Sequence, residues 1–133
     1  MTNGTATVEA FLGHIFSGAM DKALELVHPQ AKFISTRPTP NPNNPLHGTF
    51  VGPEGAKAFF GGFADLLEPG EFNVDARFAE GEHVALYGTL QHKSRATGRD
   101  FASDWALICK VEADKIVLYH FYEDTAALAI AIA

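Results

Sequence analysis

The spacing of the apolar residues changes once along this chain, and that change limits the folds open to it. In the first half, apolar residues recur every three or four positions, as Val8, Phe11 and Ile15 do, which is typical of amphipathic helices. From Phe72 onwards apolar and polar residues alternate, which is typical of strands that bury one face. Helices followed by an antiparallel sheet predict an α+β fold in which the helices cover one face of the sheet.

Turn-forming residues divide the chain into the expected elements. Thr7 and Asp124 are each expected to cap a helix through a side-chain oxygen. Residues 37–45 contain four prolines and three asparagines, so they are expected to form a long loop. The expected helices cover residues 8–16, 22–27, 53–67 and 126–132, and the expected strands cover residues 32–36, 72–78, 83–93, 100–111 and 115–123.

Length and charge exclude several classes of protein. The 133 residues suit one domain, residues 1–133, with a single core and a modest cavity. Sixteen acidic residues against ten basic ones give a net charge of −6, which disfavours nucleic acid as a partner. The nearest approach to a basic cluster, residues 92–99, is expected at a hairpin tip.

Cys109 is the single cysteine, which excludes an intrachain disulfide. No apolar run nears the roughly 20 residues that span a bilayer, so we expect a soluble, cytoplasmic protein without a membrane partner.

Two segments resemble a known family. Residues 48–60, GTFVGPEGAKAFF, and residues 114–128, DKIVLYHFYEDTAAL, are similar to patterns of the nuclear transport factor 2-like superfamily, in its SnoaL-like and ketosteroid-isomerase-like branch. The resemblance implies a cone-shaped, curved antiparallel sheet packed by the N-terminal helices. It also implies a pocket for a small apolar or aromatic molecule, and an isomerase, cyclase or lyase that needs no cofactor. A homodimer is expected because such a sheet leaves one broad face to be covered.

The resemblance also allows a test of the steroid-isomerase residues. As aligned, the tyrosine of that site falls on Phe11, the base on Ser35 and the second acid near Ala106. Phenylalanine has no hydroxyl to donate, serine is a poor base near neutral pH, and alanine does neither. Steroid isomerisation by the known route is therefore not expected. The alternative to an enzyme is a non-catalytic module that binds a ligand or only forms a dimer.

Three residues are candidates for catalysis: Glu123, Asp104 and Tyr119. Glu123 shares a strand face with Tyr119 and with Phe121, where the acid of related cyclases and epoxide hydrolases falls. A carboxyl group among aromatic rings would be desolvated and suited to acid–base chemistry, although at a strand end it could instead lie in solvent. Asp104 faces the cavity only if residues 106 and 108 do, and Trp105 then packs on the other side. Tyr119 or Tyr87 would donate a hydrogen bond.

The remaining predictions concern the lining of the cavity. Arg37, at the start of the long loop, is expected either to meet an anionic ligand or to form a surface ion pair. Of the six histidines, His47 at the loop end is the one best placed to meet a ligand. Nothing in the spacing of the histidines and the cysteine indicates a metal or a cofactor. The expected lining residues are Phe11, Ile15, Phe33, Ser35, Phe60, Phe63, Tyr87, Ala106, Ile108, Tyr119, Phe121 and Glu123.

Overall fold

The fold, known here from a computed structural model that describes residues 4–133, is built around one six-stranded sheet. The elements in chain order are α1 (Thr5–Phe16), α2 (Met20–Leu24), β1 (Val27–Ser35), β2 (Thr49–Val51), α3 (Gly52–Leu66), β3 (Leu67–Glu80), β4 (His83–Ser94), β5 (Asp100–Glu112), β6 (Lys115–Glu123) and α4 (Thr125–Ile132).

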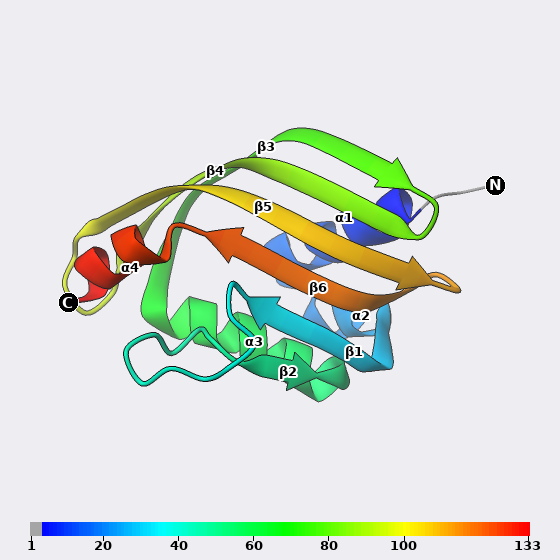
Figure 1. The fold of residues 1–133 in the computed structure, drawn as a ribbon, viewed down its shortest axis with the longest axis horizontal. Helices are drawn as coiled ribbons and strands as arrows, with labels where there is room; N and C mark the ends of the chain where they lie inside the picture. Colours follow the sequence, from blue (N-terminus) through cyan, green and yellow to red (C-terminus); the bar gives the residue numbers. More distant parts are fainter. Residues whose placement is uncertain (1–3) are drawn as a thin grey trace.

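The strand order explains how the helices come to cover one face of the sheet. The strands lie in the order β2-β1-β6-β5-β4-β3, and every neighbouring pair is antiparallel except β1 and β6, which are parallel. Because a parallel pair needs a long connection, the whole meander from β3 to β5 lies between β1 and β6 in the sequence. The sheet is curved, and α1, α2 and α3 lie along the same side of it (Figure 1). The predicted α+β fold is confirmed.

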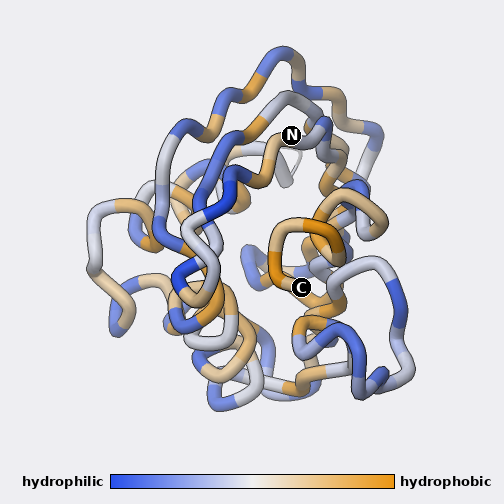
Figure 2. Tube along the Cα trace, turned by 90° about the vertical axis from the view of Figure 1, so that its left-hand side faces the viewer, coloured by the Kyte–Doolittle hydropathy of each residue, from blue (hydrophilic) through white to orange (hydrophobic). Residues whose placement is uncertain are grey.

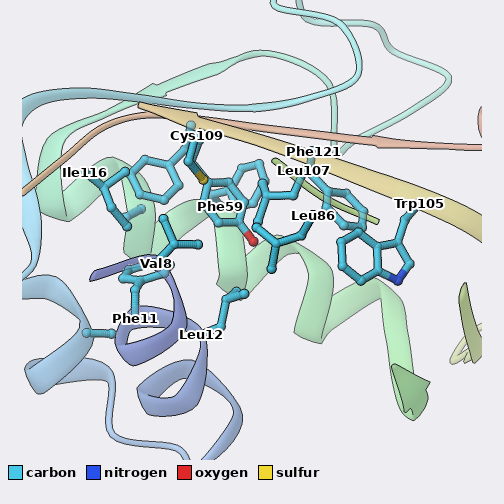
Figure 3. Close-up of a cluster of buried hydrophobic side chains, with 14 of the residues drawn as sticks. Val8, Phe11, Leu12, Phe59, Leu86, Trp105, Leu107, Cys109, Ile116 and Phe121 are labelled. Atoms are coloured by element: carbon cyan, nitrogen blue, oxygen red, sulfur yellow. The ribbon is translucent and has the colours of Figure 1, made fainter. Parts of the chain in front are cut away.

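The core fills the space between these helices and the inner face of the sheet. Val8, Phe11 and Leu12 of α1 and Phe59 of α3 point toward the side chains that project from the strands (Figure 3). All four are buried, with at most 6% of the residue surface exposed. Complete burial of such an apolar side chain contributes about 1.5–3 kcal/mol, so this layer fixes the helices against the sheet.

The structure corrects several predicted boundaries. Helix α1 begins two residues before Thr7, with Gly4 at its cap position, so the predicted Thr7 cap is wrong. The second helix was predicted to reach residue 27, but α2 ends at Leu24. Strand β1 begins at Val27, five residues earlier than predicted. Strand β2 was not predicted because three residues are too few to show a hydrophobic period.

The predicted cap of the last helix is confirmed. Asp124 Oδ1 accepts a hydrogen bond of 3.0 Å from the backbone N–H of Ala127, which satisfies a donor in the first turn of α4. This helix is coloured as hydrophobic along its length beside the C label (Figure 2), and its Leu128 and Ala131 are buried. None of the helices within residues 4–133 is both long and apolar enough to cross a membrane.

Candidate functional site

A cavity of about 360 Å³ lies between the helices and the inner face of the sheet. Helices α1, α2 and α3 form one wall, and strands β3, β4 and β6 form the other. Its walls are largely aromatic, which suits a flat apolar molecule. The lining residues are Ile15, Phe16, Met20, Phe59, Phe60, Phe63, Ala64, Leu67, Pro69, Phe72, Leu90, His92, Tyr119, Phe121 and Glu123.

Trp105 supports the sheet side of this cavity. Its ring centroid lies 4.4 Å from that of Phe72 and 5.8 Å from that of Phe121, and its indole Nε1–H donates a 3.1 Å hydrogen bond to the backbone carbonyl of Thr89. Trp105 and Phe121 lie side by side under the sheet (Figure 3). The indole is thus fixed in position, and two of the rings that line the cavity stack against it.

A second aromatic group packs behind Tyr119. Phe33 stacks on the Tyr119 ring at 5.0 Å, and Phe11 meets the edge of the same ring at 5.8 Å. Phe11 and Phe33 are fully buried, and only 1% of the surface of Ser35 is exposed. The structure therefore places these three residues in the core beyond the cavity wall and corrects their expected position in the lining. Of the expected lining residues, Ile15, Phe60, Phe63, Tyr119 and Phe121 do lie on the wall.

Glu123 lies on the inner face of β6, in register with Trp105 of β5. Both of its carboxyl oxygens are buried, and neither has a hydrogen-bond partner anywhere in residues 4–133. Burial in these apolar surroundings disfavours the ionised form and raises the pKa of the carboxyl group from 4.5 to about 7. The side chain thus borders the cavity instead of extending into solvent, and it is close to half ionised near neutral pH.

Tyr119 supplies a second polar group to the wall. The residue is 3% exposed, and its hydroxyl makes no hydrogen bond with any residue in the described part of the chain. Desolvation holds the pKa of this hydroxyl well above its usual value, with a smaller contribution from Cys109. Tyr119 therefore stays protonated and can donate a hydrogen bond to a molecule in the cavity.

His92 is a lining residue that the sequence did not reveal. Strand β4 ends at Ser94, one residue beyond the predicted strand, and His92 takes an inward position two residues after Leu90. Its Nδ1 accepts a 3.0 Å hydrogen bond from the backbone N–H of Gly70. Desolvation lowers the pKa of the imidazole, which favours the neutral ring. Residues two apart on a strand share a face, so the position of His92 two residues after the apolar Leu90 was the signal that could have identified it.

Four predicted site residues lie on the opposite face of the sheet. Tyr87 is 46% exposed and Ile108 39% exposed, and Ala106 and Asp104 project from β5 in the same outward direction. Their expected position in the cavity is wrong because Trp105 turns inward, and neighbouring residues of a strand face opposite sides. Asp104, Tyr87 and Ala106 border a separate hollow on the outer face, which Glu123 also touches.

This orientation also changes the comparison with steroid isomerases. The position assigned to the second acid, Ala106, faces outward. The inward residues on either side of it are Trp105 and Leu107, and neither carries an acid. Neither inward neighbour of Ala106 therefore supplies the second acid of that set.

The long loop contributes nothing to the cavity wall. Arg37 is exposed and forms no ion pair with residues 4–133. His47 is buried, and its Nε2 lies 3.1 Å from the side-chain amide of Asn44. Burial lowers the pKa of His47, and the positive charge of Arg37 lowers it further. The structure thus places both residues away from the ligand position expected for them.

Comparison with known proteins bears on the family. The model of the SnoaL-like domain matches residues 8–119. A nuclear transport factor 2-like protein from Burkholderia xenovorans LB400 has a TM-score of 0.85 and 24% identity, over 98% of this chain and 95% of that one. TerC, co-crystallised with polyporic acid, has a TM-score of 0.83 and 19% identity, over 97% of each chain.

A more distant match is a protein of ketosteroid isomerase-like fold from Catenulispora acidiphila DSM 44928 in complex with trimethylamine. Its TM-score is 0.69 and its identity 12%, over 85% of this chain and 81% of that one. None of the curated proteins compared with this chain matches it. At these identities the solved structures show a shared fold, whereas the family model covers most of the sequence. The chain belongs to the family of SnoaL-like domain proteins.

Proposed function

We propose that this protein binds a small, largely apolar or aromatic molecule in the cavity and that Glu123 acts on it as a general acid or base. One observation carries the proposal: a carboxyl group with both oxygens buried and unpartnered borders a cavity walled by aromatic rings. A buried acid without a partner destabilises the folded protein, so its presence at a cavity is characteristic of a site that uses it.

The chemistry proposed for the site is proton transfer without a cofactor. With a pKa of about 7, Glu123 can give up or take a proton near neutral pH, and such a positioned group contributes about 10²- to 10⁴-fold to a rate. The hydroxyl of Tyr119 would donate a hydrogen bond to an oxygen that gains negative charge. These roles suit an isomerase, a cyclase or a lyase. The complexes of TerC with polyporic acid and of the Catenulispora protein with trimethylamine support a small organic molecule as the ligand.

A non-catalytic binding module is the second candidate. It is favoured by Phe11 and Ser35, onto which the resemblance aligns the donor and the base of steroid isomerases. The two functions differ in what Glu123 does. In an enzyme Glu123→Gln lowers turnover much more than affinity, whereas in a binding module it leaves ligand affinity intact and there is no turnover to lose.

Filling the cavity from α3 should prevent binding. Ala64 borders the cavity, so Ala64→Phe should weaken the binding of an aromatic probe such as 1-tetralone about tenfold or more. Trp105, the single tryptophan, stacks behind the cavity wall, so its fluorescence should report the binding. The matched control is Ala58→Phe, on an exposed position of the same helix. Equal affinities of the two variants would contradict a ligand position in this cavity.

We also propose that the outer face of the sheet pairs with the same face of a second copy. Phe78 is 59% exposed there and stacks on Tyr87 at 6.1 Å, beside Ile108 and Tyr122. Ile108→Lys should therefore weaken dimerisation about 100-fold, as measured by sedimentation equilibrium. Ala58→Lys, on the helical side, should have no effect. A wild-type protein that stays monomeric at micromolar concentration would show that this face has another role.

A further inference from the structure

We propose that His92 is the second anchor of this cavity and that its Nε2–H donates a hydrogen bond to a carbonyl or enolate oxygen of the bound molecule. The inference rests on the proposed function, because it concerns the ligand of the same cavity. It adds the chemical class: an apolar or aromatic ring system that carries an oxygen acceptor.

The position of the proton on His92 follows from its neighbour. A neutral imidazole holds one proton, on Nδ1 or on Nε2. The backbone N–H of Gly70 donates to Nδ1 at 3.0 Å, so Nδ1 is the acceptor and the proton lies on Nε2. Burial of the ring also favours the neutral form at pH 7. His92 is thus a hydrogen-bond donor with a fixed tautomer.

The backbone around Gly70 is shaped to hold the ring in this way. The pairing of β3 with β4 shifts register between Glu68 and Glu71, and Gly70 lies within the shift. A Cβ atom at Gly70 would lie 2.2 Å from the carbonyl oxygen of Gln91, so no larger residue fits there. The irregularity therefore directs a backbone N–H to an imidazole, where a regular ladder would direct it to a carbonyl.

His92 contacts the backbone of the protein at Gly70 and at Gln91. The ring also lines the cavity, where a bound molecule can meet it, and shares that wall with Leu90, Pro69 and Phe72. It borders in addition a polar groove whose lining includes Glu68, Glu71, Lys93 and Asp100. An oxygen atom of a ligand could accept a hydrogen bond from the ring on the cavity side, which a pure hydrocarbon cannot do.

The distance between the two anchors indicates the length of the ligand. Glu123 is in register with Trp105, and Trp105 with Gly88 of β4. His92 follows Gly88 by four residues, a rise of about 13 Å along the strand. A molecule that contacts both groups is therefore longer than one ring, with its oxygen acceptor toward His92 and its exchangeable proton toward Glu123.

The test compares two probes that differ in one group. The ketone 1-tetralone and the hydrocarbon tetralin share a ring skeleton, and calorimetry measures the affinity of each. The wild-type protein should prefer the ketone about fivefold, the usual effect of one hydrogen bond. His92→Phe should abolish the preference and keep the affinity for tetralin, and His92→Gln, which retains an N–H donor, should restore part of it. The control His83→Phe changes an exposed histidine at the start of the same strand.

Each outcome separates this inference from the proposed function. Equal affinities of the wild-type protein for the two probes would overturn the role of His92 and leave the apolar cavity intact. Failure of both probes to bind would overturn both proposals. A second measurement needs no ligand and no variant that must fold: ¹⁵N NMR of the imidazoles at pH 7.5 should show His92 neutral and protonated on Nε2. A charged ring, or a proton on Nδ1, would contradict the inference.

Discussion

Replacing Glu123 with glutamine should raise the free energy of unfolding by about 3 kcal/mol at pH 8 and change it little at pH 4. The cause is the rise of its pKa from 4.5 in the unfolded chain to about 7 in the folded one. Below pH 4.5 the carboxyl group is protonated in both states. As the pH rises from 4.5 to 7, the unfolded chain gains the favourable ionisation and the folded chain does not, so stability falls. Above pH 7 the carboxyl group is ionised in both states, so the free energy of unfolding falls no further. Glutamine cannot ionise, so the variant escapes this loss.

Urea unfolding from pH 4 to pH 8.5, followed by Trp105 fluorescence, measures this difference. Asp104→Asn is the matched control because it removes a carboxylate from the exposed outer face of the neighbouring strand, and its stability curve should parallel that of the wild type. If the Glu123→Gln curve also runs parallel, the carboxyl group is hydrated or paired in solution. A gain in stability together with a loss of turnover would identify Glu123 as a group retained for activity at the expense of stability.

Gly88→Ala should destabilise the protein by about 3 kcal/mol or more. A Cβ atom there would lie 1.7 Å from the backbone oxygen of Asn73 on β3 and 3.1 Å from Cζ2 of Trp105. The first contact is with backbone, which cannot rotate away, so β3 and β4 must separate. The second would displace the indole against which Phe72 and Phe121 stack, so the aromatic wall of the cavity should loosen as well.

The measurement is the midpoint of urea unfolding together with the emission maximum of Trp105, which should shift toward the red as the indole meets water. Gly61→Ala provides the opposite case. Gly61 lies inside α3 with no atom within 4 Å of the position of a Cβ, so alanine should stabilise the helix by about 1 kcal/mol. If Gly88→Ala were as stable as the wild type, the close approach of β3 to β4 would be absent in solution.

The sequence was sufficient to predict the elements whose ends are marked by turn-forming residues. Helix α3 and strand β6 were predicted within a residue or so of their bounds because glycine, proline or acidic turn residues stand at both ends of each. The period of two places Tyr119, Phe121 and Glu123 on one side of β6, and the family resemblance indicated that this side faces the cavity. Glu123 was therefore a candidate before the structure was known, although a position in solvent remained the alternative.

The orientation of β5 could not be predicted in the same way. Both sides of this strand carry apolar residues: Trp105 and Leu107 on one, Ala106 and Ile108 on the other. A period of two then fits either orientation, and a slip of one residue exchanges the faces. The choice is made by the indole of Trp105, which needs the volume beneath the sheet beside Phe72 and Phe121, and that volume exists only in the tertiary structure.

His92 was missed for a different reason. Its role depends on a hydrogen bond from Gly70, 22 residues earlier, and on an irregular register between two strands. Neither leaves a periodic pattern in the sequence. The basic residues at 92–99 favoured a solvent-exposed hairpin tip, whereas His92 and Lys93 are still paired with β5, opposite Phe101 and Asp100.

The place of β6 between β1 and β5 has a consequence for synthesis on the ribosome. Residues 27–35 pair with residues 116–121, so β1 has no partner on that side until the last strand has been made. Contacts this distant in sequence form slowly, and the emerging chain cannot close its sheet before β6 leaves the ribosome. Glu123 ends that strand. The pocket is therefore completed by the same event that completes the fold, and an incomplete nascent chain exposes the aromatic wall without being able to bind.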